Sequence, residues 1–148
     1  AYSVLIQPTA EELAAAQKDP GYSILRRDRQ AHIVFDRASG VTGYAAFEAV
    51  SLPEDEIVAD IAPETMVMHR TAEDGTLIVS VCDPNLHIKE KTYTTPEPSA
   101  PSFKTLHLRG AWSLAVSNEK VKIQLTGDVT EITVTCRHGQ PVEFRLKQ

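Results

Sequence analysis

Five histidines carry the most versatile chemistry in this sequence, and their spacing limits what they could do. None falls in an HxH, HExxH or cysteine–histidine pattern, the spacings at which side chains share a metal ion. His69 and His87 could lie on neighbouring strands, so a metal-binding pair stays open, but the pattern favours imidazoles hydrogen-bonded locally. We therefore expect no metal site. The full set is His32, His69, His87, His107 and His138.

Motifs for nucleophilic catalysis and phosphate binding are absent from the sequence. No GxSxG segment presents a serine, and Ser39, next to Gly40, suits a turn. Acidic pairs follow Pro53 in a segment typical of a solvated loop, and most of the seven glycines fall at turns. The sequence therefore predicts no catalytic residue and no cofactor in this chain.

Carbohydrate binding is the chemistry that the other side chains could best support. The C–H groups of a sugar pack on exposed aromatic faces, while polar neighbours bind its hydroxyls. Trp112 follows a turn, and we expect it to cap the core, with a sugar platform as the alternative. The aromatic candidates are Trp112, Tyr44, Tyr93 and Phe47.

Arg26, Arg27 and Arg29 form the one dense basic group, and guanidinium groups suit sulfate or carboxylate. Side chains alternate along a strand, so Arg27 and Arg29 would share one face and Arg26 the other. A solvated face or a contact between domains is the alternative. The candidate substrate-binding residues are Trp112, Tyr44, Arg27 and Arg29.

The elements that must position these side chains are mostly strands. Thr9 and Glu12 form a capping box that predicts a short helix ending near Lys18, before Asp19-Pro20-Gly21. Beyond it, apolar and polar residues alternate, which is typical of antiparallel strands with one buried face. The segment 76–82 is apolar on both faces and predicts a central strand. Further strands are expected at 2–6, 23–27, 31–35, 43–47, 57–61, 66–70, 86–91, 103–108, 121–125, 131–136 and 142–146.

Turn residues separate these segments, so the pattern predicts a mostly β fold. We expect an antiparallel two-sheet β-sandwich of about ten strands, with one short N-terminal helix. The proline-rich segment 94–102 should cross between layers. Residues 1–20 would form a strand and a helix, and residues 21–148 the sandwich.

Composition and charge exclude two classes of partner. With 20 acidic against 15 basic residues the net charge is −5, which argues against a nucleic-acid binder. No apolar run approaches the ~20 residues of a membrane span. Cys82 and Cys136 allow one disulfide, but both fall in strand patterns, which favours buried free thiols.

An ordered series of segments resembles the C-terminal domain of chondroitin ABC lyases, in the hyaluronate and chondroitin lyase group (polysaccharide lyase family eight). Its parts are GYSILRRD at 21–28, HIVFD at 32–36, VTGY at 41–44, MVMHR at 66–70, TLIVS at 76–80, DPNL at 83–86, GAW at 110–112 and the closing strand at 142–146. Residues 2–12 look like the family's exit from its central β-domain. The resemblance spans essentially the whole chain.

The resemblance implies an extracellular or periplasmic parent enzyme that cleaves chondroitin and dermatan sulfates by β-elimination. The family's catalytic side chains lie on an α/α toroid and a central β-domain, neither of which this sequence contains. His32 and Tyr44 match structural positions rather than the acid and base. The resemblance thus implies an accessory domain that braces the parent's toroid and central β-domain, and that could contact chondroitin or dermatan sulfate. An independent carbohydrate-binding module is the alternative, and a small enzyme with an unrecognised site is a third.

Overall fold

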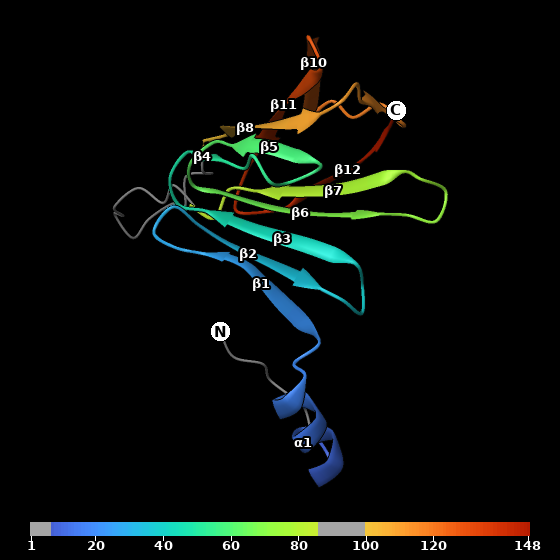
Figure 1. Ribbon diagram of the computed structural model, residues 1–148. Coiled ribbons are helices and arrows are strands. Elements are labelled where there is room, and N and C mark those ends of the chain that lie inside the picture. Colours follow the sequence, from blue (N-terminus) through green and yellow to red (C-terminus); the bar gives the residue numbers. More distant parts are fainter. Residues whose placement is uncertain (1–6, 86–99) are drawn as a thin grey trace, which may run out of the picture.

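The chain folds as two stacked antiparallel sheets, with one helix that precedes them (Figure 1). The computed structural model describes residues 7–85 and 100–148. In this part of the chain, α1 (Ala10–Lys18) is followed by 12 strands. The prediction of a mostly β, two-sheet sandwich with a short N-terminal helix is confirmed.

The larger sheet has seven strands among the described residues, and neighbouring strands in it are antiparallel. Its edges are β1 and β9, so side chains on these strands lie at opposite sides of the molecule. In spatial order the strands are β1 (Tyr22–Arg27), β2 (Ala31–Asp36), β3 (Val41–Ala46), β6 (Thr65–Thr71), β7 (Leu77–Cys82), β12 (Val142–Lys147) and β9 (Ser113–Leu114).

The smaller sheet has five strands and covers one face of the larger sheet. Among the described strands, the chain passes from it to the larger sheet three times, between β5 and β6, between β8 and β9, and between β11 and β12. In spatial order its strands are β10 (Val121–Thr126), β11 (Val129–Cys136), β8 (Ser102–Arg109), β5 (Val58–Ile61) and β4 (Val50–Ser51).

The core lies between the sheets and is built from the alternation seen in the sequence. Leu77, Val79 and Val81 of β7 are at most 1% exposed, and they face Leu106 and Ile132 of the smaller sheet, both at 0%. Burying each such side chain stabilises the fold by roughly 1.5–3 kcal/mol. This shared core holds the two sheets together.

The strand predictions are largely confirmed, with one difference at β7. It is central, between β6 and β12, but Ile78, Ser80 and Cys82 on its second face are only half-buried. No second layer of described residues covers that face. The count exceeds ten because β4 and β9 are two-residue strands, too short to leave a pattern. The strands expected at 2–6 and 86–91, and most of the 94–102 segment, lie outside the described residues.

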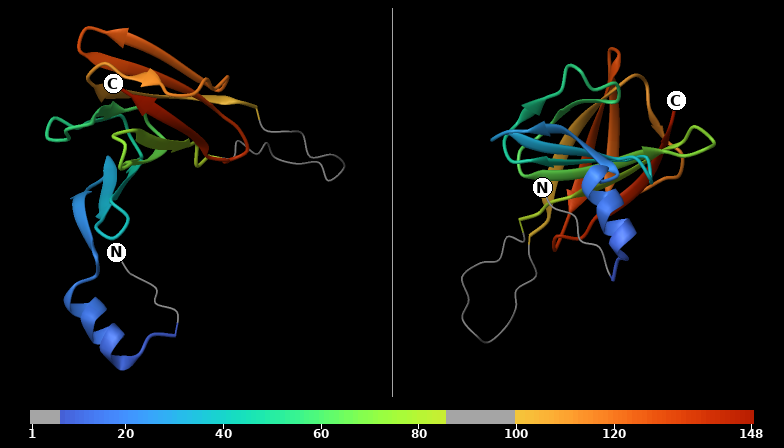
Figure 2. Two further views of the ribbon diagram at one scale, coloured as in Figure 1. Left: turned by 90° about the vertical axis from the view of Figure 1, so that its right-hand side faces the viewer. Right: turned by 60° about the horizontal axis from the view of Figure 1, so that its bottom comes forward.

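Helix α1 begins and ends as the sequence predicts, but it contributes nothing to the core. Thr9 Oγ1 accepts from the Glu12 amide, and the Glu12 carboxylate accepts from the Thr9 amide at 2.8 Å, which completes the capping box. The helix has no buried residue. It stands apart from both sheets, beyond the first residue of β1 (Figure 2). The described part of the chain therefore buries no residue of this helix.

Candidate functional site

Two predicted binding residues lie at the β1–β2 hairpin, where the turn brings them close together. Arg27 is the last residue of β1 and pairs with His32 of β2, while Arg29 lies in the turn between the strands. Asp28 shapes this turn, because its Oδ1 accepts from the amides of Gln30 (2.8 Å) and Ala31 (3.0 Å). The expectation that Arg27 and Arg29 share one face of a strand needs a correction, because β1 ends at Arg27 and Arg29 lies in the turn.

The aromatic ring of Phe47 also lies beside the hairpin, a position that the strand pattern does not predict. The Gln30 carbonyl accepts from the Phe47 amide at 2.8 Å, which brings the residue after β3 beside the turn. The Phe47 and His32 rings meet at 89° with centroids 5.1 Å apart. Phe47 remains 51% exposed. We call Arg27, Arg29, His32 and Phe47 the hairpin cluster.

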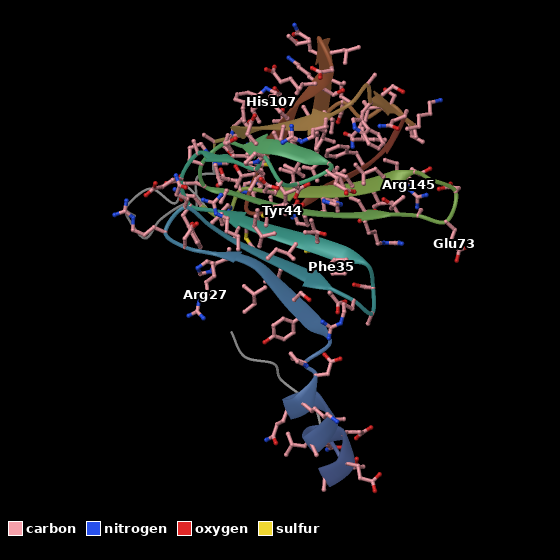
Figure 3. All side chains as sticks on the ribbon, in the orientation of Figure 1. Arg27, Phe35, Tyr44, Glu73, His107 and Arg145 are labelled. Atoms are coloured by element: carbon pink, nitrogen blue, oxygen red, sulfur yellow. The ribbon has the colours of Figure 1, made fainter. Side chains whose placement is uncertain are left out.

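The three arginines of this segment differ in what their guanidinium groups already bind. Arg26 donates to Asp28 Oδ2 and to Gln30 Oε1, both at 2.7 Å, on the opposite side of β1. The Ala31 amide and this arginine hold the pKa of Asp28 down to about 2. Within the described residues, Arg27 and Arg29 have no hydrogen-bond or ion-pair partner. Figure 3 shows Arg27 extending away from the ribbon, on the far side of the molecule from His107.

Tyr44 lies in the core, where its ring offers no face to a sugar. It is 3% exposed, and its hydroxyl donates to Asp55 Oδ2 at 2.6 Å. His69 Nε2 lies 2.9 Å from the Tyr44 hydroxyl oxygen, and the Tyr44 and His69 rings stack with their centroids 5.5 Å apart. Since that oxygen gives its one hydrogen to Asp55, His69 donates through Nε2. The expectation of Tyr44 as an exposed platform is therefore not met.

Burial favours the uncharged forms of the Tyr44 hydroxyl and the His69 imidazole in this network. Burial, reinforced by Asp55, raises the pKa of Tyr44, and burial lowers the pKa of His69. Asp55 Oδ1 accepts from the amides of Ile57 and Val58, so the network ties β3 and β6 to the loop before β5. His69 Nδ1 is buried without a partner among the described residues. Sequence reasoning missed this network, because Asp55 lies in a segment typical of a solvated loop.

Trp112 is half-buried and packs against the core near β9. Its indole Nε1 donates to the Arg109 carbonyl at 2.7 Å, and its amide donates to Thr130 Oγ1 at 2.9 Å. Gly110 makes the turn before it, with φ of +88°, a region that favours glycine. Because β9 and β1 are opposite edges of the larger sheet, Trp112 is remote from the hairpin cluster. The structure does not bring the four candidate residues into one site.

Other titratable groups make pairs across strands but no recognisable reaction centre. His107 lies between Asp60 and Glu131, with nitrogen–oxygen distances of 2.6 and 3.3 Å. Buried Lys104 pairs with Asp83 at 3.3 Å. Among residues 7–85 and 100–148, no three acidic, histidine or cysteine side chains are placed to hold a metal ion. No helix in the same part of the chain is long and apolar enough to cross a membrane.

An apolar strip runs across the outer face of the larger sheet, beside the hairpin cluster. Ile24 pairs with Val34, Val34 with Gly43, and Gly43 with Met68, in one row across four strands. The exposed fractions are 46% for Ile24 and 53% for Met68, and Met66 on the adjoining row is 46% exposed. We call Ile24, Val34, Met66 and Met68 the outer strip. It lies between the hairpin cluster and the end of β1 that leads to α1.

Comparison with known proteins matches this domain to segments of much longer polypeptides. The chain is 35% identical to a chondroitin sulfate ABC endolyase of Proteus vulgaris, over 98% of this chain and 14% of that protein. It is 22% identical to a chondroitin sulfate ABC exolyase of Bacteroides thetaiotaomicron, over 99% of this chain and 16% of that protein. No family model matches the sequence.

A solved structure of Paenibacillus xanthan lyase has the same fold. It matches with a TM-score of 0.67 at 14% identity, over 96% of this chain and 12% of that one. The chain thus spans about one seventh of the length of the curated relatives that it matches.

Proposed function

Because this chain is related along nearly its whole length to one segment of the chondroitin sulfate ABC lyases, we propose that it is an accessory β-sandwich domain of a glycosaminoglycan lyase. In this role it braces the domains that carry the reaction. Elimination needs a base at C5 of the uronic acid, an acid at the departing O4 and a group that neutralises the carboxylate. Those groups belong to the rest of the parent, which acts on extracellular polysaccharide outside the cytoplasm.

The observation that carries this proposal is apolar surface without a partner in the domain itself. Helix α1 has nine residues and none is buried, and isolated helices of that length are marginal in water. The outer strip adds exposed Ile24, Met66 and Met68 on the same face of the sheet. Contiguous apolar surface of this kind typically marks a protein–protein contact. The rest of the lyase polypeptide is the partner that covers it.

The test compares the outer strip in two settings, the isolated chain and the longer lyase that carries it. Met68→Lys should leave the melting temperature of the isolated chain unchanged, because the side chain already faces water. In the longer lyase the same change should lower the melting temperature by several degrees, because it places a charge in the interface. Gln124→Lys, an exposed change on β10 of the other sheet, is the control. Equal behaviour of both variants in the longer lyase would contradict a bracing role.

A further inference from the structure

The hairpin cluster has the composition of a binding site for an acidic sugar. It places two guanidinium groups beside an imidazole and an aromatic ring at one end of the larger sheet. Asp28 Oδ1 accepts hydrogen bonds from the amides of Gln30 and Ala31, and the Gln30 carbonyl accepts one from the Phe47 amide, so the side chains project from a defined hairpin. A site on such a frame loses little freedom when a ligand binds.

The lack of a partner for either guanidinium group among the described residues points to an anionic ligand. The chain has 20 acidic and 15 basic residues, so partners for a surface arginine are plentiful. Arg26, one residue away, has two such partners, whereas Arg27 and Arg29 have none among the described residues. A guanidinium fork matches the oxygens of a carboxylate or sulfate and can bind two of them at once. Glu48, next to Phe47, pairs with neither arginine.

The aromatic part of the cluster adds selectivity for a sugar over a free anion. Phe47 keeps 51% of its surface exposed while its edge contact with His32 fixes the ring. A fixed aromatic surface suits the C–H groups of a pyranose, and the neighbouring imidazole can hydrogen-bond a hydroxyl. Ring and cations together match a sugar that bears an acidic group.

We propose that the hairpin cluster binds the acidic units of a glycosaminoglycan chain, with Arg27 and Arg29 on the carboxylate or sulfate and Phe47 under the sugar ring. The choice of chain rests on the proposed function. The cluster adjoins the outer strip, since His32 pairs with Ala45 and Ala45 with Met66. A parent that covers the outer strip would therefore have this site at the rim of its interface, where a long polysaccharide could reach both.

Binding to the isolated chain is measured by calorimetry with a chondroitin sulfate hexasaccharide. A hyaluronan hexasaccharide, which has carboxylates but no sulfate, separates the two acidic groups, and a neutral cellohexaose reports the ring contact alone. We expect binding of the acidic oligosaccharides that weakens as salt rises. Arg27→Ala, Arg29→Ala and Phe47→Ala should each reduce affinity about tenfold, which corresponds to roughly 1.4 kcal/mol.

Matched controls are available on distant surfaces. Arg145→Ala removes an exposed arginine from β12, and Phe103→Ala removes an exposed ring from β8, and neither should change affinity. No measurable binding of any acidic oligosaccharide at millimolar concentration would overturn the proposal. Equal losses in the controls would also overturn it, because they would indicate nonspecific attraction.

The same variants separate this proposal from the bracing role. If Arg27→Ala and Arg29→Ala destabilise the longer lyase while the isolated chain binds oligosaccharide as before, the cluster is a domain contact and the binding proposal fails. If binding is lost in these variants but Met68→Lys has no effect on the longer lyase, the bracing role fails and the site stands.

Discussion

Trp112 and the hairpin cluster lie at opposite edges of the larger sheet. Substitutions at Trp112 can therefore report on the fold, and substitutions in the cluster on binding. The indole is held by a hydrogen bond to Arg109 and by packing against the core. The cluster instead projects side chains that the fold does not need. Variants at the two places should therefore separate stability from recognition.

Trp112→Ala should lower the free energy of unfolding by about 3 kcal/mol, because it removes a large packed ring and a hydrogen bond. Chemical denaturation measures this value. Trp112 is the chain's one tryptophan, so its emission is specific. Chondroitin oligosaccharides should leave that emission unchanged, since the cluster is remote. Saturable quenching by oligosaccharide, together with an unchanged stability of the variant, would instead make Trp112 a sugar platform.

The pH dependence of stability should follow two histidines of opposite behaviour. Hydrogen bonding to Asp60 raises the pKa of His107 above 6.5, so its contribution is full below pH 6.5 and lost as pH rises through the raised value. Burial lowers the pKa of His69 below 6.5, so its neutral form stabilises above pH 6.5 and this stability is lost as pH falls. Together they predict a stability maximum near pH 6.5.

Denaturation across pH 5 to 9, in the chain and in His107→Gln, tests this prediction. In His107→Gln the free energy of unfolding should no longer decline above neutral pH. It should still decline on the acidic side, where His69 becomes protonated. His32→Gln, which removes an exposed imidazole, is the matched control and should keep both limbs. A decline at high pH that is identical in all three proteins would assign it to other groups.

Among the elements, α1 and the sheets differ in what they contribute to this chain's own stability. The helix is locally complete, with its capping box and no buried residue, whereas each strand pairs with at least one neighbouring strand. The boundary expected near residue 20 stays a prediction: the helix before it has no buried residue, and the strands after it share a core.

Deleting residues 1–20 should leave the melting temperature of the sandwich within ~2 °C of the full chain, because none of its described residues, 7–20, is buried. Differential scanning calorimetry of the two chains measures it. In the longer lyase, by contrast, a helix-disrupting change such as Ala14→Pro should lower the melting temperature, since there the helix has a partner. A large loss of stability in the truncated sandwich itself would mean that residues 1–20 belong to its core.

The two cysteines lie on β7 and β11, in different sheets, and both are free thiols. Burial raises the pKa of Cys136 and of Cys82, which slows oxidation of either thiol. We expect two reactive thiols per unfolded chain and no change of melting temperature with reductant. A titre of zero, with a loss of ~2–4 kcal/mol on reduction, would indicate a structural disulfide.

For the whole molecule, the titratable groups are dispersed rather than convergent. Tyr44 and His69 are enclosed in the core, and His107 is held between two carboxylates on the other sheet. This dispersed arrangement of the described residues supports the proposed accessory role rather than an elimination by this chain.

The isolated chain should therefore not depolymerise chondroitin sulfate. Elimination creates an unsaturated uronate, whose ultraviolet absorbance is followed against a protein-free blank and against the longer lyase as positive control. We expect the blank rate. Turnover by material free of the longer enzyme, abolished in Tyr44→Phe or His69→Gln, would assign a reaction to the buried network.

Local sequence patterns determined the elements of this protein. The capping box at Thr9 and Glu12 and the alternation in β10, β11 and β12 depend on neighbours a few residues away, which a sequence displays directly. The similarity to chondroitin lyases also indicated the sandwich and a lyase parent, because the matching segments occur in the same order along the sequence. Two-residue strands such as β4 and β9 left no such pattern.

Only the tertiary structure decided which side chains meet and which face water. Tyr44 alternates like any strand residue, and its burial follows from His69 and Asp55, which lie 25 and 11 residues away. Arg26 and Arg27 are adjacent in the sequence, yet one is bound at the turn and the other has no partner in the described chain. Phe47 lies beside this turn because its amide donates a hydrogen bond to the Gln30 carbonyl. Such contacts depend on how strands pair across the sheet, which composition and periodicity do not encode.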